Sequence, residues 1–225
     1  MSAHQVYTDE IKAHLNSFSG NIPLHRSEAK RKYSFSSAAF TEQLLIWDDV
    51  WRNNNSFYLR LHAYFFLERH LKKESELKLM WPVVVKWQEQ VNDWGLCDAL
   101  AKVYTKILEL MPVEVYTQLE SWNSDKNLWK RRQSIVSLLY YSRTKKHYLS
   151  FEQITALVSP LLDDREYYVQ KAVGWSLREL NNVYAGQTMA YLKANIKQIS
   201  GMALTTAMEK MSPADLSALR AARKV

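Results

Sequence analysis

Three segments of this sequence carry its most chemically informative side chains. They supply three tryptophans (Trp94, Trp129 and Trp175), the carboxylate of Asp98 and the basic cluster Lys130–Arg132. Trp94 and Asp98 are four residues apart, so they share one face of the helix that their segment predicts. Arg132 closes a run of three basic residues, and Trp175 lies in a second segment that carries charged side chains. Tryptophan rings attract cations through their π-faces, and a carboxylate stabilises nearby positive charge. The set is therefore typical of an electron-rich pocket for a cationic ligand.

The helical phase turns Trp94 and Trp175 away from the most apolar faces of their helices. The two apolar rows consist of Leu96, Leu100, Val103 and Ile107, and of Val169, Val173, Leu177 and Leu180. A tryptophan outside such a row can be covered by a neighbouring helix or by a nucleotide, and Asp98 taken alone could be a surface charge. The sequence leaves these alternatives open. Gly174, directly before Trp175, permits close approach of either a helix or a ligand.

Arg132 interrupts an apolar row that includes Leu128 and Ile135. A guanidinium in such a place needs a carboxylate or a phosphate as its partner, because burying it unpaired is costly. The alternative is that its aliphatic stem packs while its head reaches solvent. Lys130 and Arg131 point to other sides of the predicted helix, where they are expected to form a solvated or phosphate-facing cluster.

The composition predicts a basic protein built from helices. The chain has 225 residues, a formal net charge of +7 and a pI near 9.3, which favours a polyanionic partner. With only five Gly and five Pro, a sandwich or a barrel is disfavoured. The apolar runs are too short to span a bilayer and the first residues show no signal-like pattern, so we expect a cytoplasmic protein without a membrane partner.

Several classes of chemistry lack their residues in this sequence. The single cysteine, Cys97, allows neither an intrachain disulfide nor a cysteine zinc cluster, and is interpreted as a small packing residue. The six histidines show no metal-ligand spacing, and no glycine-rich phosphate loop is present. We therefore expect no metal and no cofactor, and an activity that rests on charge and shape.

Apolar residues recur with helical periodicity along most of the chain. An opening helix is predicted over residues 7–18, then a polar and basic loop with a short helix over 21–37. The other predicted helices are 39–53, 56–71, 75–89, 93–109, 113–123, 126–142, 151–161, 165–182, 185–198, 200–211 and 213–223. Helix pairs recur about every 35–45 residues without a long crossover, which predicts an all-α fold of the α-solenoid class, with a globular bundle as the alternative. We expect one domain over residues 1–225, with 1–38 less regular.

Local signals mark several helix ends. The segment Ser150–Gln153 predicts a capping box, and Ser212–Asp215 predicts an N-cap followed by an acidic residue. Pro82 lies inside a predicted helix and is expected to kink or restart it. Asp163 and Asp164 are expected to cap the helix that carries Trp175.

Three segments resemble the AlkD-type DNA alkylation repair proteins, a family of HEAT-like helical-repeat DNA glycosylases. They are Trp94–Asp98, Ser124–Ile135 and Val169–Glu179. The resemblance implies a superhelix of HEAT-like antiparallel helix pairs. It also implies a monofunctional N-glycosylase that removes purines of the N3-methyladenine and N7-methylguanine type from duplex DNA. Mapped by motif, the catalytic residues are Asp98, Trp94, Trp175 and Arg132.

The resemblance further implies how the partner is held. A surface lined with Lys and Arg is expected to bind the backbone of double-stranded DNA, and the protein is expected to act as a monomer. The expected DNA-binding residues are Lys130, Arg131, Arg143, Lys145, Lys146, Lys171 and Arg178. Where the family often has a Phe-Gly-Ile-x-Thr-Pro-like segment, this chain has Asn21–Arg26. Two other functions stay open: a non-catalytic binder of damaged or branched DNA, and a HEAT-like protein-interaction scaffold.

Overall fold

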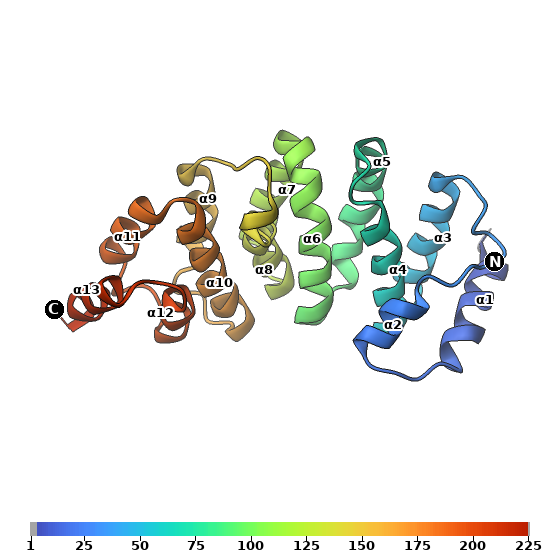
Figure 1. Ribbon diagram of the computed structural model, residues 1–225, viewed down its shortest axis with the longest axis horizontal. Coiled ribbons are helices and arrows are strands. Elements are labelled where there is room, and N and C mark those ends of the chain that lie inside the picture. Colours follow the sequence, from blue (N-terminus) through green and yellow to red (C-terminus); the bar gives the residue numbers. More distant parts are fainter. Residues whose placement is uncertain (1–3, 225) are drawn as a thin grey trace. The chain divides into compact units, whose positions relative to one another are not determined.

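The computed structural model describes residues 4–224, which form thirteen α-helices, three short 3₁₀ helices and no β-strand (Figure 1). This confirms the all-α prediction. The chain divides into two compact units, the first ending at Val103 and the second beginning at Tyr104. The division falls within helix α6 (Trp94–Leu110). The expectation of one domain over the whole chain stays a prediction.

The first unit is built around helix α4 (Phe57–His70). Every residue from Leu59 to Leu67 is buried, because α1, α2 and α3 pack against this helix. The other elements of the unit, before α6, are α1 (Gln5–Asn16), α2 (Ile22–Glu28), α3 (Phe40–Arg52), α5 (Glu74–Val84) and the 3₁₀ helix η1 (Val85–Gln90). In its core, the rings of Trp51 and Trp87 stack with centroids 4.5 Å apart, which joins α3 to η1.

Helix α10 (Tyr167–Val183) has the central place in the second unit, where it contacts α8, α9, α11 and α12. The elements that follow α6 are α7 (Pro112–Asn123), α8 (Leu128–Val136), η2 (Ser142–Thr144), α9 (Phe151–Val158), η3 (Ser159–Leu161), α11 (Ala185–Ala194), α12 (Gly201–Met208) and α13 (Pro213–Lys224). Gly174 lets α12 approach α10, since a Cβ at this position would lie 2.6 Å from the carbonyl oxygen of Ala203. Of the two uses predicted for this glycine, the structure shows the helix contact.

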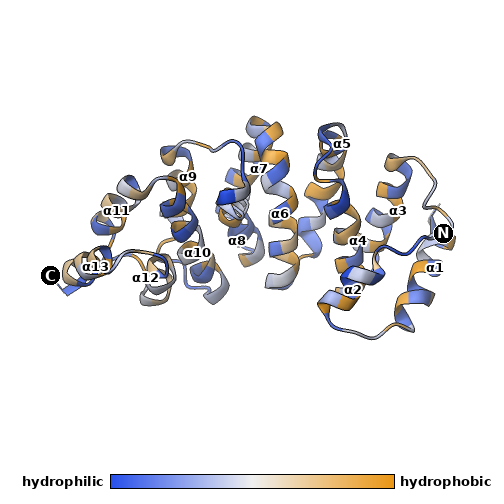
Figure 2. Ribbon diagram, in the orientation of Figure 1, coloured by the Kyte–Doolittle hydropathy of each residue, from blue (hydrophilic) through white to orange (hydrophobic). Residues whose placement is uncertain are grey.

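Several helix boundaries follow the local signals. Ser150 and Gln153 form a complete capping box at the start of α9, and the Ser212 hydroxyl accepts the N–H of Asp215 at 3.2 Å at the start of α13. Pro82 lies near the end of α5, which continues as η1. Hydrophobic and hydrophilic residues alternate along the helices (Figure 2). None of the helices in residues 4–224 is both long and apolar enough to cross a lipid bilayer.

The prediction of one helix over residues 126–142 was wrong. Helix α8 ends at Val136, and the chain then turns through Tyr141, whose φ of 47° is in the left-handed region. The turn is held by α10: the buried Glu179 carboxylate accepts the Ser142 N–H at 2.9 Å and its hydroxyl at 2.7 Å. This distant carboxylate fixes the turn that follows the helix, although the apolar periodicity of the sequence continues.

The expectation that Asp163 and Asp164 cap α10 was also wrong. The N-cap of α10 is Glu166, which makes no side-chain capping bond. The Asp164 carboxylate accepts the N–H of Glu166 at 2.9 Å and is paired with Arg131 of α8. The preceding loop therefore uses Asp164 to join α8 to the start of α10.

Candidate functional site

Trp94 and Asp98 lie on the first turns of α6, in the first unit. Asp93 begins this helix, because its carboxylate accepts the N–H of Leu96 at 3.0 Å. Trp94 is 57% exposed, whereas Leu96 is 1% exposed, so the helical phase predicted for this segment is correct. Asp98 is half-buried. An exposed indole and a carboxylate one turn apart can meet a cationic ligand from the solvent side.

Arg60 positions the segment that leads to Trp94. It is 4% exposed, and it donates from Nε to the carbonyl oxygen of Trp51 at 3.2 Å and from Nη1 to that of Gln90 at 2.8 Å. These bonds join α4 to the end of α3 and to the end of η1. The sequence interpretation missed Arg60, although a charged residue within the apolar run of α4 was the available signal, because a buried guanidinium must find acceptors.

Trp175 lies on α10 in the second unit and is half-buried. Its ring contacts the ring of Tyr140, with centroids 5.6 Å apart. Tyr140 belongs to the turn that Glu179 holds one helical turn further along α10. A neighbouring aromatic side chain thus covers part of Trp175, and the residue as a whole is only partly exposed.

Arg132 on α8 is 7% exposed and donates from Nη1 to the carbonyl oxygen of Tyr168 at 2.8 Å. The structure shows a backbone carbonyl of α10 as one partner of the guanidinium; the expectation of a carboxylate or phosphate partner stays a prediction. Tyr168 and Trp175 lie on one row of α10, seven residues apart. Within the second unit, the structure therefore places Arg132 and Trp175 against the same helix.

Arg131 does not belong to a solvated cluster, which corrects its predicted place. Its Nε donates to Asp164 at 2.7 Å, and its Nη1 donates to the carbonyl oxygens of Asp125 and Lys126. The guanidinium thus closes the loop before α8 and the loop before α10. Lys130 is half-buried, with its Nζ 3.4 Å from the Asp125 carboxylate. Backbone and carboxylate acceptors of the protein itself therefore occupy Arg131.

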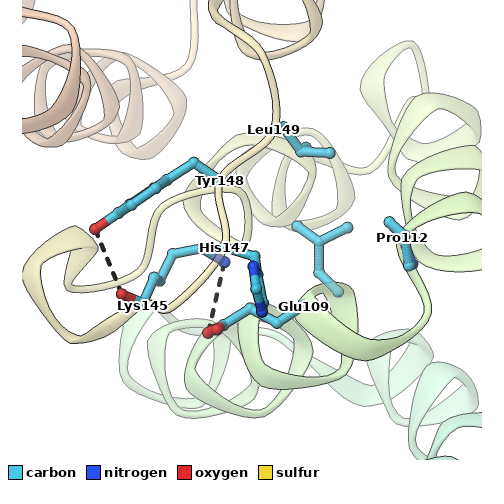
Figure 3. Close-up of a pocket in the computed structure, with 7 residues that line it drawn as sticks. Glu109, Pro112, Lys145, His147, Tyr148 and Leu149 are labelled. Atoms are coloured by element: carbon cyan, nitrogen blue, oxygen red, sulfur yellow. Dashed lines mark hydrogen bonds and ion pairs between the residues drawn. The ribbon is translucent and has the colours of Figure 1, made fainter.

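Lys145, which was expected to bind DNA, is likewise buried, at 8% exposure. Its Nζ donates to the Oγ1 and carbonyl oxygen of Thr105 at 2.9 and 3.3 Å, and lies 3.9 Å from Glu109. Burial lowers the pKa of its ammonium group to about 8. A cavity of about 370 Å³ is lined by Leu108, Glu109, Pro112, Lys145, His147, Tyr148 and Leu149 (Figure 3).

Glu109 organises the loop around this cavity. It accepts the backbone N–H of Lys146 at 2.8 Å and the Nζ of Lys106 at 2.9 Å, and Figure 3 marks its ion pair with Lys145. These hydrogen bonds lower the pKa of Glu109 although burial alone would raise it. Lys145 is thus one of several cations that hold the loop in place.

The remaining expected DNA-binding residues differ in exposure. Arg143, Lys146 and Lys171 are exposed, which leaves their charges accessible to a polyanion. Arg178 pairs with Glu209, which follows α12, and its side chain is only 17% exposed. Of the seven residues expected to bind DNA, Arg143, Lys146 and Lys171 are therefore the three that the structure leaves exposed.

The structure assigns the four candidate catalytic residues to two units. Trp94 and Asp98 belong to the first, and Arg132 and Trp175 belong to the second. That all four act on one nucleotide stays a prediction.

The fold and the site define the class of the protein. It is an all-helical repeat protein whose exposed tryptophan, nearby carboxylate and exposed cations suit the binding of a polyanion. The sequence model of the family described as "DNA alkylation repair enzyme" matches residues 9–211. The chain belongs to this family, and its role is that of an enzyme of DNA repair with DNA as its partner.

Two solved structures share the fold. AlkD2 from Streptococcus mutans superposes with a TM-score of 0.61 at 18% identity, over 93% of this chain and 100% of that chain. The protein smu.31 from Streptococcus mutans UA159 gives a TM-score of 0.60 at 18% identity, with the same coverage of both chains. The search of curated proteins finds no match. At this identity the likeness establishes the helical-repeat fold.

Proposed function

We propose that the protein is a monofunctional DNA N-glycosylase that hydrolyses the N-glycosidic bond of positively charged N-alkylated purines in duplex DNA. The observation that carries the proposal is the pair on α6: Trp94, 57% exposed, lies one turn before Asp98, within the region that matches the repair family. No metal or cofactor is needed for this chemistry. The proposed place of action is the cytoplasm of a bacterial-type cell, at its DNA.

The chemistry requires stabilisation of positive charge. A purine alkylated at N3 or N7 carries a positive charge that weakens its bond to the sugar, so the base departs readily and leaves an oxocarbenium-like sugar. A fixed carboxylate stabilises such a sugar, as it does in glycoside hydrolysis. Asp98 has this role in the proposal, and it orients the attacking water. The face of Trp94 contacts the cationic nucleotide, an interaction of about 0.5–2 kcal/mol.

The second unit contributes contacts to the nucleotide and its phosphates. Trp175, which is partly exposed beside Tyr140, is proposed to contact the nucleotide. Arg132 is proposed to hold a phosphate near the lesion, with its orientation fixed by the bond to the Tyr168 carbonyl. Arg143, Lys146 and Lys171, which are exposed, are proposed to contact the backbone of the duplex.

The direct test is incubation of the protein with a duplex that carries one N7-methylguanine, followed by alkali to cleave abasic sites. The expected result is strand cleavage at the modified position only, and none in the unmodified duplex. A protein that binds this duplex at low salt but never creates an abasic site would instead be a non-catalytic binder of damaged DNA. Absence of both binding and cleavage would favour the protein-interaction scaffold.

A further inference from the structure

Three aromatic side chains gather where α8 and α10 begin. The ring of Trp129 lies 5.0 Å from the ring of Tyr168, tilted by 36°. The ring of Tyr167 meets that of Tyr168 edge-on, at 5.1 Å and 83°. We call these three residues the aromatic shelf. None of them belongs to the four proposed catalytic residues.

The shelf is exposed although it is aromatic. Tyr167 is 56% exposed and Tyr168 is 36% exposed, and Trp129 is half-buried. Such adjacent exposed rings are uncommon on a protein surface without a binding role, because they leave apolar area in water. Stacking on a flat, apolar partner would remove that area from water.

The backbone beneath the shelf is fixed from two sides. The side chain of Asn127 accepts the N–H of Trp129 at 2.9 Å, which sets the start of α8. Arg132 donates to the carbonyl oxygen of Tyr168 at 2.8 Å, which sets the start of α10. A rigid aromatic surface loses little conformational entropy when a ligand binds, so it suits recognition by stacking.

The charges beside the shelf suit a nucleotide. The Nζ of Lys171 lies 5.9 Å from the centre of the Tyr167 ring, and Lys171 is exposed. The nearby carboxylate of Asp164 is paired with Arg131. Asp163 and Glu166 add exposed carboxylates, and Arg165 adds an exposed cation. Affinity here is therefore expected to come mainly from stacking, with Lys171 as the cation beside the rings that can contact a phosphate.

We propose that the aromatic shelf stacks on an unpaired base of DNA while Lys171 contacts an adjacent phosphate. Base stacking on aromatic side chains is tolerant of sequence, because every base has a π-face. Tyr168 and Trp175 lie on one row of α10, seven residues and about 10 Å apart along the helix. The shelf would therefore hold a base beside the damaged nucleotide. This extends the proposed function and rests on its assignment of Trp175 to the lesion.

The test uses two undamaged single strands of equal length: oligo(dT), and the same phosphodiester chain made of abasic tetrahydrofuran units. Both carry the same phosphates, but only the first has bases to stack. The wild-type protein is expected to bind oligo(dT) about tenfold or more tightly than the abasic chain at one salt concentration, by fluorescence anisotropy. The double variant Tyr167→Leu/Tyr168→Leu keeps apolar side chains but removes two of the three rings of the shelf, and is expected to lose most of the preference for oligo(dT).

Two controls complete the test. Tyr167→Phe/Tyr168→Phe keeps the rings and should retain the preference for oligo(dT). Lys171→Gln should weaken binding of both strands by the same factor. Equal binding of the two strands by the wild-type protein would overturn the proposal. Since neither strand contains a lesion, this outcome is distinct from a failure of excision on N7-methylguanine, which would overturn the proposed function and leave the shelf as a site for unpaired bases.

Discussion

Arg132 on α8 donates a hydrogen bond of 2.8 Å from Nη1 to the carbonyl oxygen of Tyr168, in the first turn of α10. The adjacent Arg131 joins the same two regions through Asp164. The two arginines are therefore neighbours in sequence with different structural positions: Arg132 is directed to the α10 row that carries Trp175, whereas Arg131 closes two loops. This difference separates the effects expected when each is replaced.

Arg132→Ala is expected to lower duplex affinity and excision together, because a phosphate anchor acts in both the ground state and the transition state. Arg131→Ala should mainly reduce stability, by about 1–3 kcal/mol, since it leaves the Asp164 carboxylate without its partner. Urea unfolding and DNA titration on the same two variants measure both effects. Equal losses of affinity in the two variants would contradict the roles given to them.

Asp98→Asn keeps the size of the side chain and removes its charge. If Asp98 stabilises an oxocarbenium-like sugar, single-turnover excision of N7-methylguanine should fall by about 100-fold or more, while binding to undamaged duplex holds or tightens slightly. The matched control is Asp93→Asn, which changes a carboxylate at the start of the same helix but keeps a good N-cap residue. A folded Asp98→Asn protein that excises at the wild-type rate removes the proposed catalytic role.

Binding to undamaged duplex should depend strongly on salt and little on sequence. The chain carries a net charge of +7, and Arg143, Lys146 and Lys171 are exposed. Contacts between such cations and phosphates release counterions, so the logarithm of the affinity should fall linearly with the logarithm of salt concentration. Replacing Lys146 by Gln should make this slope shallower by about one unit, and replacing the buried Lys145 by Met should not. A slope that is unchanged in the Lys146 variant would remove this residue from the interface.

Gly174→Ala should destabilise the second unit. The added Cβ would lie 2.6 Å from the carbonyl oxygen of Ala203, so α10 and α12 would have to separate, at a cost of about 1–3 kcal/mol. Gly186→Ala is the control, because a Cβ there meets nothing within 4 Å and alanine favours a helix by about 0.5–1 kcal/mol over glycine. The melting temperatures of the two variants should therefore shift in opposite directions. A Gly174→Ala protein with an unchanged melting temperature would show that α10 and α12 are not held at this distance.

Acid should destabilise the first unit through His62 on α4. The pKa of His62 is lowered to about 4, mainly by burial and in smaller part by His25, His14 and Arg69. The Nδ1 of His25 lies 3.1 Å from the Nε2 of His62. The unfolded chain takes up this proton near its ordinary pKa of 6.5. Between about pH 6.5 and 4, the unfolded state therefore binds more protons than the folded state. The free energy of unfolding that neutral His62 contributes is complete above pH 6.5 and is lost as the pH falls through that range.

Urea unfolding between pH 4 and 7.5 measures this effect. His62→Gln should make the stability less dependent on pH over that range, and His147→Gln, at an exposed position, should keep the wild-type dependence. Parallel curves for the wild-type protein and His62→Gln would assign the acid sensitivity to other groups.

The helical content and the phase of the main helices could be predicted from the sequence. Periodicity and capping are local properties: they depend on side chains within one or two turns, which is why the capping box at Ser150 and the outward position of Trp94 were both correct. The residue types of the candidate site, Asp98 and the tryptophans among them, could be chosen from the sequence for the same reason. The family assignment also depends on sequence patterns alone.

The partners of the charged side chains were decided by the tertiary structure. Whether Lys145 faces solvent or Thr105, and whether Asp164 caps a helix or binds Arg131, depends on which distant segments approach these side chains. The same holds for the end of α8, where Glu179 of α10 captures Ser142 and overrides the local periodicity. A charged group that leaves water must find a partner or an acceptor, and only the packing of remote helices determines which one lies within reach.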